Sequence, residues 1–521
     1  MKFKKILILL FIISLFCLLF ISIKNYIGQT GKKNFFYLTI SQHLPLDFKI
    51  FLKEKIFVHK ENTRLNIELK NLSNENKELR KKINNELNTL EFKNNSFLEF
   101  NNEFFVKIFQ NKLIKNFSPK SYIEIYNNKL FLITGSGEIF YLNEIEDLFD
   151  PLSKSIKMNQ IASNLKYLFL ENSALNFLEF DIWEQQVIKD ILIYENKIFI
   201  SYVKKIKSNK DKPILAFPDD FHDAPNRDEL INELLNKDNN CYVNAIAVSD
   251  LNLTNLKFND FLTFKECFGD LAYSQTGGNL HAFKENKILM STGDWRSYER
   301  PGFVKDFPQD INSYMGKILS INLKDKLKKI ISLGHRNPQG MFYDKNDDIL
   351  YMTEHGPQGG DEVNINVNPG KRIKNYGWAI ASYGEYDDVY SDQFTDEEII
   401  QKKKVGPLHK NHETFGFEEP IIHFSPLSIG ISEIVKADKF FQNNSNEQNL
   451  FFGSLGYDDI GKDTWSIHYL KLKKNNKIIN RKVFKINERI RDLKKFNINN
   501  EDALLMTLEN GSIAIAKSKK F

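Results

Sequence analysis

The residues with the clearest chemical potential form a Gly-His-Arg-Asn-Pro segment, residues 334–338. The segment puts an imidazole, a guanidinium and a carboxamide side by side at an expected strand end or tight turn. The guanidinium of Arg336 is a planar fork of N–H donors that matches a carboxylate or a quinone oxygen. Arginine and asparagine also tie loops together, so the residue types alone favour a functional site only slightly over a structural one.

A second polar segment, residues 354–362, bends repeatedly because it is rich in glycine and contains Pro357. Such a turn exposes carbonyl oxygens beside carboxylates, and calcium binds oxygen ligands of both kinds. Asp387 and Asp388 follow shortly afterwards and supply further acid. The segment therefore suggests a calcium site, although a glycine-rich turn with solvated acids is the commoner arrangement.

Strands must position these segments, and one kind of apolar run recurs after about Asn95. The six copies are residues 129–134, 197–202, 287–292, 348–353, 449–454 and 502–507. Most begin with a polar turn residue and end with a small or hydroxylated one, which predicts the inner strand of a blade beside a central channel. We therefore predict an all-β, six-bladed β-propeller over residues 95–521, with a β-sandwich as the alternative. The polar insertions 211–240 and 386–412 are expected to be surface loops.

The residues before the propeller predict an attachment to a membrane. Residues 6–23 carry no charge and follow three lysines, which predicts a transmembrane signal-anchor helix with residues 1–5 in the cytoplasm. A cleaved signal peptide is the alternative, but no small-residue cleavage pattern follows the apolar run. We expect the rest of the chain in the periplasm of a bacterium, tethered to the inner membrane.

Residues 24–94 are expected to form a helical stalk. Apolar residues between Leu65 and Leu90 recur at alternating spacings of four and three, which is a short coiled-coil seam. Asn76 at a seam position could fix the register of a homodimer. A single helix packed on the propeller explains the pattern nearly as well.

Composition narrows the function classes. The chain has 521 residues, a formal net charge of only +5, and 44 Phe with 20 Tyr, which suits sheets and gives no reason to expect a nucleic-acid partner. Cys17, Cys241 and Cys267 provide neither a disulfide scaffold nor a thiolate metal site. A single disulfide between Cys241 and Cys267 and a pair of separate thiols are about equally consistent with their positions at predicted strand ends.

Three motifs in order, GHRNPQG, TEHGPQGGDE and NYGW, resemble the glucose/sorbosone dehydrogenase family of quinoprotein aldose dehydrogenases. Supporting matches are GGNL at 277–280, STGD at 291–294, GKILSI at 316–321, FFGSL at 451–455 and ERIRDL at 488–493. The resemblance covers roughly residues 100–521. It implies a six-bladed propeller that holds pyrroloquinoline quinone (PQQ) on calcium, oxidises an aldose to a lactone, and passes electrons to a membrane or periplasmic acceptor.

The resemblance also implies roles for individual residues. Arg336 would polarise the quinone carbonyl, Asn337 would contact the cofactor, and the carbonyls of Gly356 and Pro357 would hold the cofactor's calcium. The arginines expected to bind the cofactor's carboxylates are Arg489 and Arg491. The residues that resemble a structural calcium site are Glu362, Tyr376 through its carbonyl, and Asp387.

Three positions depart from the family pattern. The base histidine before the glycines is here Gln275, the lysine after the GSL element is Gly456, and Ser425 stands in the segment where the family has Trp-Pro. A carboxamide cannot act as the general base, whose loss typically costs roughly two to four orders of magnitude in rate. His281 and His355 are candidate substitutes.

The departures motivate an alternative function. A catalytically degenerate, calcium-stabilised propeller could use its altered channel to bind a glycan, a peptide or a partner protein. The retention of Arg336, Asn337, Arg489 and Arg491 in matching places favours the enzyme, because a scaffold released from cofactor binding has little use for these four residues together.

Overall fold

The computed structural model describes residues 89–100, 103–111, 120–149, 153–165, 168, 187–207, 240–266, 275–295, 306–385, 396–441, 446–456 and 463–519. These residues form strands β1 to β27, the helix α8 (Asp396–Val405) and the short 3-10 helices Ile145–Leu148 and Glu413–Phe415. The predicted all-β class is confirmed. The helix α8 lies in the insertion 386–412, where only loop was expected.

The strands group into six four-stranded antiparallel blades, which we number 1 to 6, and β1 joins blades 1 and 6 into one larger sheet. Blade 1 contains β3 (Ser121–Tyr126), β4 (Lys129–Thr134), β5 (Ile139–Leu142) and β6 (Ser155–Ser163). Blade 2 contains β7 (Ile188–Tyr194), β8 (Lys197–Lys207), β9 (Asn240–Asp250) and β11 (Asn259–Thr263). Blade 3 contains β12 (Gly277–Ala282), β13 (Lys287–Thr292), β14 (Lys317–Asn322) and β15 (Lys328–Leu333).

The second half of the chain continues the pattern. Blade 4 contains β16 (Asn337–Asp344), β17 (Ile349–His355), β18 (Asp361–Val367) and β20 (Ile422–Phe424). Blade 5 contains β21 (Ile431–Lys436), β22 (Glu447–Ser454), β23 (Ser466–Lys473) and β24 (Ile478–Lys485). Blade 6 contains β25 (Ile490–Ile498), β26 (Glu501–Leu508), β27 (Ser512–Ser518) and β2 (Phe104–Gln110). The two-residue strands β10 (Asn255–Leu256) and β19 (Lys374–Asn375) pair in parallel with β6 and β15.

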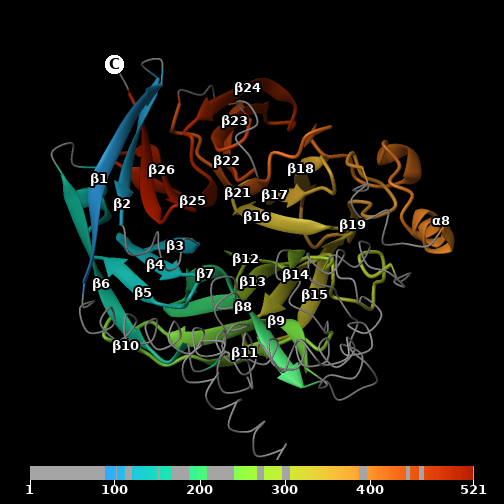
Figure 1. The fold of residues 1–521 in the computed structure, drawn as a ribbon, viewed down its shortest axis with the longest axis horizontal. Helices are drawn as coiled ribbons and strands as arrows, with labels where there is room; N and C mark the ends of the chain where they lie inside the picture. The colour runs from blue at the N-terminus through green and yellow to red at the C-terminus, as the bar shows by residue number, and fades with distance from the viewer. Residues whose placement is uncertain are drawn as a thin grey trace, which may run out of the picture. The chain divides into compact units, whose positions relative to one another are not determined.

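The six blades close into a ring. The first strand of each blade contacts the first strand of the next, in the order β3, β7, β12, β16, β21 and β25, and β25 contacts β3 again. Figure 1 shows the blades following one another around the centre in chain order. The hydrophobic core lies largely between neighbouring blades, as where Phe131 of blade 1 belongs to one buried cluster with Ile191 and Ile200 of blade 2. The closed ring of six sheets is the predicted propeller architecture.

The recurring apolar runs occupy a different place from the one expected. They form or lie within β4, β8, β13, β17, β22 and β26, the second strand of each blade, and not the innermost strand. A second strand has a neighbour on both edges and a blade on both faces, so consecutive apolar residues suit it. The inner strands instead carry buried charges such as Asp190, Glu433 and Asp492. Asp492 Oδ2 accepts a hydrogen bond from Ile123 N of the next blade at 2.7 Å.

Strands from both ends of the described chain close the ring. β2 completes blade 6 by pairing with β27. The long strand β1 (Thr89–Phe100) pairs with β2 through its second half and with β6 of blade 1 through residues 89–93. Figure 1 shows β1 and β2, in blue, beside the red strands of blade 6.

Strand β1 corrects the expected boundary between stalk and propeller. Leu90 was assigned to the coiled-coil seam, but it is a buried strand residue and so is Phe92, while Glu91 and Lys93 are exposed. This alternation has the period of a strand and continues into the sheet. The sheet region therefore begins at Thr89, six residues before the predicted boundary at 95.

Several predictions concern residues that the structure does not describe. The span 6–23, the rest of the stalk before Thr89, Cys17 and Cys267 lie outside the described ranges. Within those ranges no helix is long and apolar enough to cross a membrane. The anchor, the stalk and the Cys241–Cys267 disulfide stay predictions.

Candidate active site

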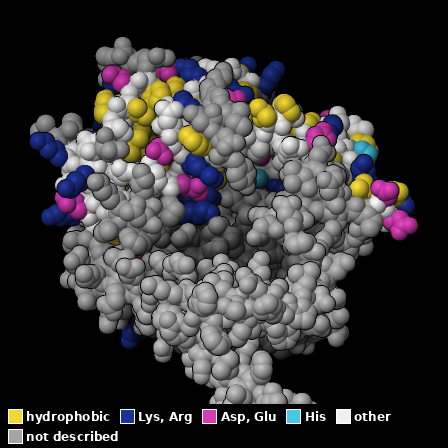
Figure 2. All heavy atoms as spheres, in the orientation of Figure 1, with side chains coloured by type: hydrophobic (Ala, Val, Ile, Leu, Met, Phe, Trp, Pro, Cys, Tyr) yellow, Lys and Arg dark blue, Asp and Glu magenta, His cyan; other side chains and the backbone are white. Residues whose placement is uncertain are grey.

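The inner strands of the ring begin at one end of the central channel, which we call the channel mouth. Gly277 N, where β12 begins, donates a hydrogen bond of 3.3 Å to Asn337 Oδ1, where β16 begins. His355 Nε2 lies 2.6 Å from the carbonyl oxygen of Ile431, the first residue of β21. The mouth therefore gathers residues that are distant in sequence. On the face drawn in Figure 2 the molecule is hollowed near its centre, with Lys and Arg side chains at the edge of the hollow.

The two predicted catalytic residues meet at the mouth. Arg336 is 8% exposed, and in the amide orientation that satisfies its neighbours Gln275 Oε1 accepts a hydrogen bond of 2.9 Å from Arg336 Nη2. In that orientation Gln275 Nε2 lies 3.3 Å from Asp294 Oδ1 and donates to it. The backbone reinforces the arrangement, because Asp294 N donates to Arg336 O at 2.8 Å. Gln275 thus lies beside the arginine at the channel mouth.

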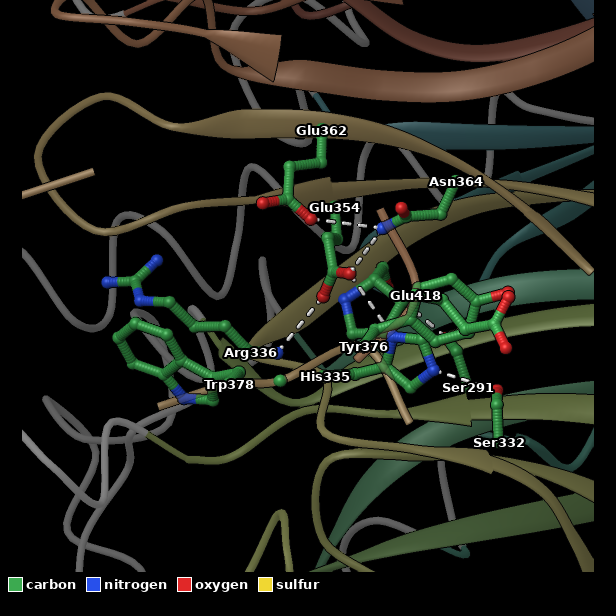
Figure 3. Close-up of polar contacts among 12 residues, drawn as sticks. Ser291, Ser332, His335, Arg336, Glu354, Glu362, Asn364, Tyr376, Trp378 and Glu418 are labelled. Atoms are coloured by element: carbon green, nitrogen blue, oxygen red, sulfur yellow. Dashed lines mark hydrogen bonds and ion pairs between the residues drawn. The ribbon is translucent and has the colours of Figure 1, made fainter. Parts of the chain in front are cut away.

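Trp378 and Asp294 hold the guanidinium of Arg336 in place. The guanidinium carbon lies 5.5 Å from the centre of the Trp378 ring, and Figure 3 shows the two groups side by side. Trp378 Nε1 donates a hydrogen bond of 2.8 Å to Asp294 Oδ2. Sequence reasoning did not assign roles to these two residues. The signal was present in the STGD and NYGW motifs, which end on Asp294 and Trp378.

A buried glutamate fixes the turn that presents Arg336. Glu354 accepts from Arg336 N through Oε2 at 3.0 Å, and His335 Nδ1 lies 3.2 Å from its Oε1. His335 Nε2 lies 2.8 Å from Ser332 Oγ, and the imidazole is fully buried. Figure 3 shows these contacts to the right of the Arg336 side chain. His335 therefore supports the turn, and Arg336 is the member of the Gly-His-Arg-Asn-Pro segment with its charge at the mouth.

The predicted carboxylate-binding arginines lie where β25 begins. Arg489 Nε is 2.7 Å from Glu509 Oε2, and Arg491 pairs with Glu509 Oε1 through Nη2. Burial opposes the charge on Glu509, but Arg491 and Arg489 outweigh it and lower the pKa of this carboxyl to about 2. Among the described residues, Arg491 Nε is a buried N–H without a hydrogen-bond partner. A further acceptor such as a ligand carboxylate would satisfy it.

Histidines near the mouth do not stand where the missing base is expected. His281 Nδ1 lies 2.8 Å from Ala282 O, and burial lowers the pKa of His281 to about 4. Burial also lowers the pKa of His355, and the charges of Arg336 and Arg491 act weakly in the same direction. Within the part of the chain that the structure describes, neither imidazole hydrogen-bonds to Gln275, and each ring lies within hydrogen-bond distance of a backbone carbonyl.

The other two departures have local structural causes. Gly456 adopts φ 52°, where glycine is favoured, and its N donates a hydrogen bond of 2.9 Å to Ile429 O. A Cβ on Gly430 would collide with the backbone of Gly456, so the two chain segments approach closely at this point. Ser425 is exposed and donates through Oγ to Tyr383 O at 3.1 Å.

The predicted calcium ligands are only partly brought together. Arg336 Nη1 donates to the carbonyl of Gly356, and Pro357 packs beside Gly384. Tyr376 stacks on His335 with ring centroids 4.9 Å apart. Asp387 lies outside the described ranges.

Glu362 lies in a buried acidic pair with Glu354. Asn364 Nδ2 bridges them, donating to Glu362 Oε2 at 3.1 Å and to Glu354 Oε1 at 2.8 Å. Burial first, and then the charge of Glu354, raise the pKa of Glu362 well above its usual value. The described residues contain no group of three or more His, Cys, Asp or Glu side chains that could hold a metal. The calcium sites therefore stay predictions.

The donors at the mouth suit a ligand with several carboxylates. Arg336, Arg489 and Arg491 present guanidinium groups toward it, and the buried Nε of Arg491 has donor capacity to spare. Trp378 adds an aromatic face beside Arg336. PQQ, a planar tricarboxylate, fits this chemistry.

Comparisons with known proteins agree with the motifs. The family model for glucose/sorbosone dehydrogenase matches residues 235–515, more than half of the chain. Aldose sugar dehydrogenase YliI of Escherichia coli is 30% identical over 167 residues, which cover 29% of this chain and 39% of that protein. Quinoprotein glucose dehydrogenase B of Acinetobacter calcoaceticus is 39% identical over 115 residues, covering 20% and 22% of the two chains.

An uncharacterized protein of Synechocystis is 29% identical over 235 residues, covering 42% of this chain and 50% of that one. The chain thus spans half or less of the length of the curated relatives it matches. Among solved structures, a glucose dehydrogenase has a TM-score of 0.49 at 17% identity, covering 77% of this chain and 96% of its own. The apo form of the soluble aldose sugar dehydrogenase of Escherichia coli has a TM-score of 0.47 at 16% identity, covering 79% and 99%. Because the family model extends over most of the propeller, the chain belongs to the glucose/sorbosone dehydrogenase family.

Proposed function

We propose that this protein is a PQQ-dependent aldose dehydrogenase that oxidises the anomeric carbon of a sugar to a lactone. The observation that carries the proposal is the position of Arg336 at the channel mouth, where Gln275 and Trp378 contact its guanidinium. The pair Arg489 and Arg491 adds two more guanidinium groups to the same mouth. Electrons would then pass to a membrane or periplasmic acceptor, which the family relationship leaves unidentified.

The side chains at the mouth have distinct roles in this proposal. When bound, PQQ supplies the quinone that accepts a hydride from the anomeric carbon. Arg336 would donate hydrogen bonds to the oxygen on which negative charge develops, and its buried setting strengthens that effect. Trp378 and Asp294 are positioning residues, because they fix the plane of the guanidinium.

Proton removal is where this chain differs most from its relatives. Gln275 can orient the sugar hydroxyl but cannot accept its proton, so turnover should be slower by roughly two to four orders of magnitude than with an imidazole base. Asp294 is a buried carboxylate within reach of Gln275. Restoring the base with Gln275→His is therefore expected to raise the turnover rate without tightening cofactor binding.

A titration of the full-length chain with PQQ in calcium buffer tests the proposal. We expect saturable binding by absorbance and calorimetry, followed by reduction of an artificial acceptor when an aldose is added. Arg336→Ala should weaken binding and abolish turnover, whereas Arg372→Ala, which removes an arginine whose side chain is 73% exposed, should change neither. The residue assignment is wrong if Arg336→Ala binds and reacts like the parent.

The second candidate is a propeller that binds a glycan or a protein without catalysis. The replacement of the base by Gln275 favours it, together with histidines that are bonded to backbone carbonyls. Failure of the parent chain to bind PQQ, combined with retention on an immobilised glycan, would support this function over the enzyme.

We also propose that residues 6–23 anchor the protein in the inner membrane with the propeller in the periplasm, and that the stalk can pair two copies. The uncharged run behind three lysines and the seam before Leu90 support these proposals. An anchored dehydrogenase would lie close to membrane electron acceptors.

A further inference from the structure

Two lysines stand at the channel mouth beside the arginine pair. Lys120 directly precedes β3, and the next residue, Ser121, accepts a hydrogen bond of 2.6 Å through its carbonyl from Thr507 Oγ1. Thr507 is near the end of β26, two residues before Glu509, and Glu509 N donates to Arg489 O at 2.9 Å. These bonds put Lys120 next to the ion pairs of Arg489 and Arg491.

Lys189 is the second residue of β7, on the other side of β3. Its side chain packs directly on Gly278, where a Cβ would collide with Lys189 Cβ and Cγ. Gly278 adopts φ 108°, a conformation that suits glycine, so the backbone leaves this space to the lysine. Gly278 is three residues from Gln275, which places Lys189 between the arginine pair and the Gln275–Arg336 contact.

The electrostatics agree with this geometry. Burial first, and then the charges of Arg491 and Arg489, lower the pKa of Lys120 to about 8 against the opposing charge of Glu509. Burial also lowers the pKa of Lys189 well below its usual value, and the charges of Lys120 and Arg491 add to that effect. Two lysines and two arginines thus act on one another around Glu509, an arrangement that an anionic ligand would stabilise.

We infer that Lys120 and Lys189 bind carboxylate groups of the quinone cofactor together with Arg489 and Arg491. The two lysines would replace the family lysine whose position is Gly456 here, supplying its charge from blades 1 and 2 instead of blade 5. This inference rests on the proposed function. It assigns the cofactor's acidic edge to the side of the mouth formed by β3, β7 and β25.

Calorimetric titration of the full-length chain with PQQ tests the inference. Lys120→Gln and Lys189→Gln should each weaken binding by roughly ten-fold to a hundred-fold, the range of a charge-assisted hydrogen bond. Lys120→Arg should largely restore affinity. The matched control is Lys324→Gln, which removes the same charge from an exposed lysine in the turn between β14 and β15.

Proton uptake provides a second measurement that does not depend on turnover. At pH 8.5 an anion that raises the lowered pKa of Lys120 should bind with uptake of up to roughly one proton, visible when buffers of different ionisation heat are compared. Lys120→Gln should reduce that uptake, and Lys324→Gln should not.

The outcomes separate the two proposals. Tight binding by the parent with unchanged affinity and uptake in both lysine variants would overturn the inference and leave the proposed function standing. No binding by the parent would overturn both. Thermal unfolding of each variant shows whether a loss of binding reflects a loss of fold.

Discussion

Glu509 is the carboxylate that holds Arg489 and Arg491 together, so Glu509→Gln removes their shared charge while keeping the size of the side chain. In the folded protein burial and the two arginines together leave its pKa at about 2, compared with an ordinary value of 4.5. A difference of about 2.5 pKa units corresponds to about 3 kcal/mol of stability at pH 7. The side chain is only 12% exposed, so solvent screens this interaction weakly.

The pH dependence has a defined sign. A carboxylate with a lowered folded-state pKa contributes its full stabilisation above about pH 4.5 and loses it as the pH falls toward 2. The difference in unfolding free energy between parent and Glu509→Gln should therefore shrink from about 3 kcal/mol at pH 7 to about 1.4 kcal/mol at pH 3. For a propeller of roughly 430 residues, 3 kcal/mol corresponds to a fall in Tm of about 3 °C.

Glu418→Gln is the matched control, because Glu418 also pairs with two cations, Arg372 and Lys374, but its side chain is 27% exposed and that of Arg372 is 73% exposed. Its loss should cost less than about 1 kcal/mol, as is typical of exposed ion pairs. Denaturant titration or calorimetry at pH 7 and pH 3 measures both variants. Equal stability of parent and Glu509→Gln at pH 7, or a gap that widens on acidification, would refute the reasoning.

Three further outcomes are expected. Trp378→Phe keeps an aromatic ring beside Arg336 but loses the hydrogen bond to Asp294. We therefore expect kcat in the acceptor assay to fall by roughly ten-fold while Tm changes little. An unchanged kcat would show that Trp378 does not position Arg336. Phe92→Asp buries a charge between β1 and blade 1 and should lower the unfolding free energy by at least about 3 kcal/mol in a denaturant titration. The control Glu91→Asp changes the exposed neighbouring residue and should leave the unfolding free energy unchanged. Deletion of residues 6–23 should move the protein from the membrane fraction to the soluble fraction on centrifugation, and a deletion variant that still pellets with membranes would contradict the proposed anchor.

The sequence predicted the blade count because second strands repeat visibly. Residues 129–134 and 287–292 match β4 and β13 in full, since a strand covered on both faces carries a continuous apolar run along its middle. It misplaced these strands within the blade because an inner strand such as β7 contains Lys189 and Asp190 and so does not look like a buried strand. Inner strands can carry polar side chains because the closed ring surrounds them with partners from other blades. A local sequence pattern does not reveal those partners.

Part of the candidate site could also be predicted from the sequence. The structure puts Gln275 beside Arg336, because the GGNL and GHRNPQG motifs overlap the starts of the neighbouring inner strands β12 and β16. Lys120 and Lys189 were missed because they stand outside any motif, and their meeting with Arg491 requires three blades to be in place. The early start of β1 was missed because Leu90 satisfies both a heptad seam and an alternating strand.

The closure of the ring by β1 and β2 has a consequence for biosynthesis. The ribosome makes these two strands first and makes β25, β26 and β27 last, so the earliest strands must wait for the latest before blade 6 exists. During that interval β2 presents an open edge that another chain could join. Premature termination before β27 would leave the edge of β2 open for good, and such fragments should aggregate through it.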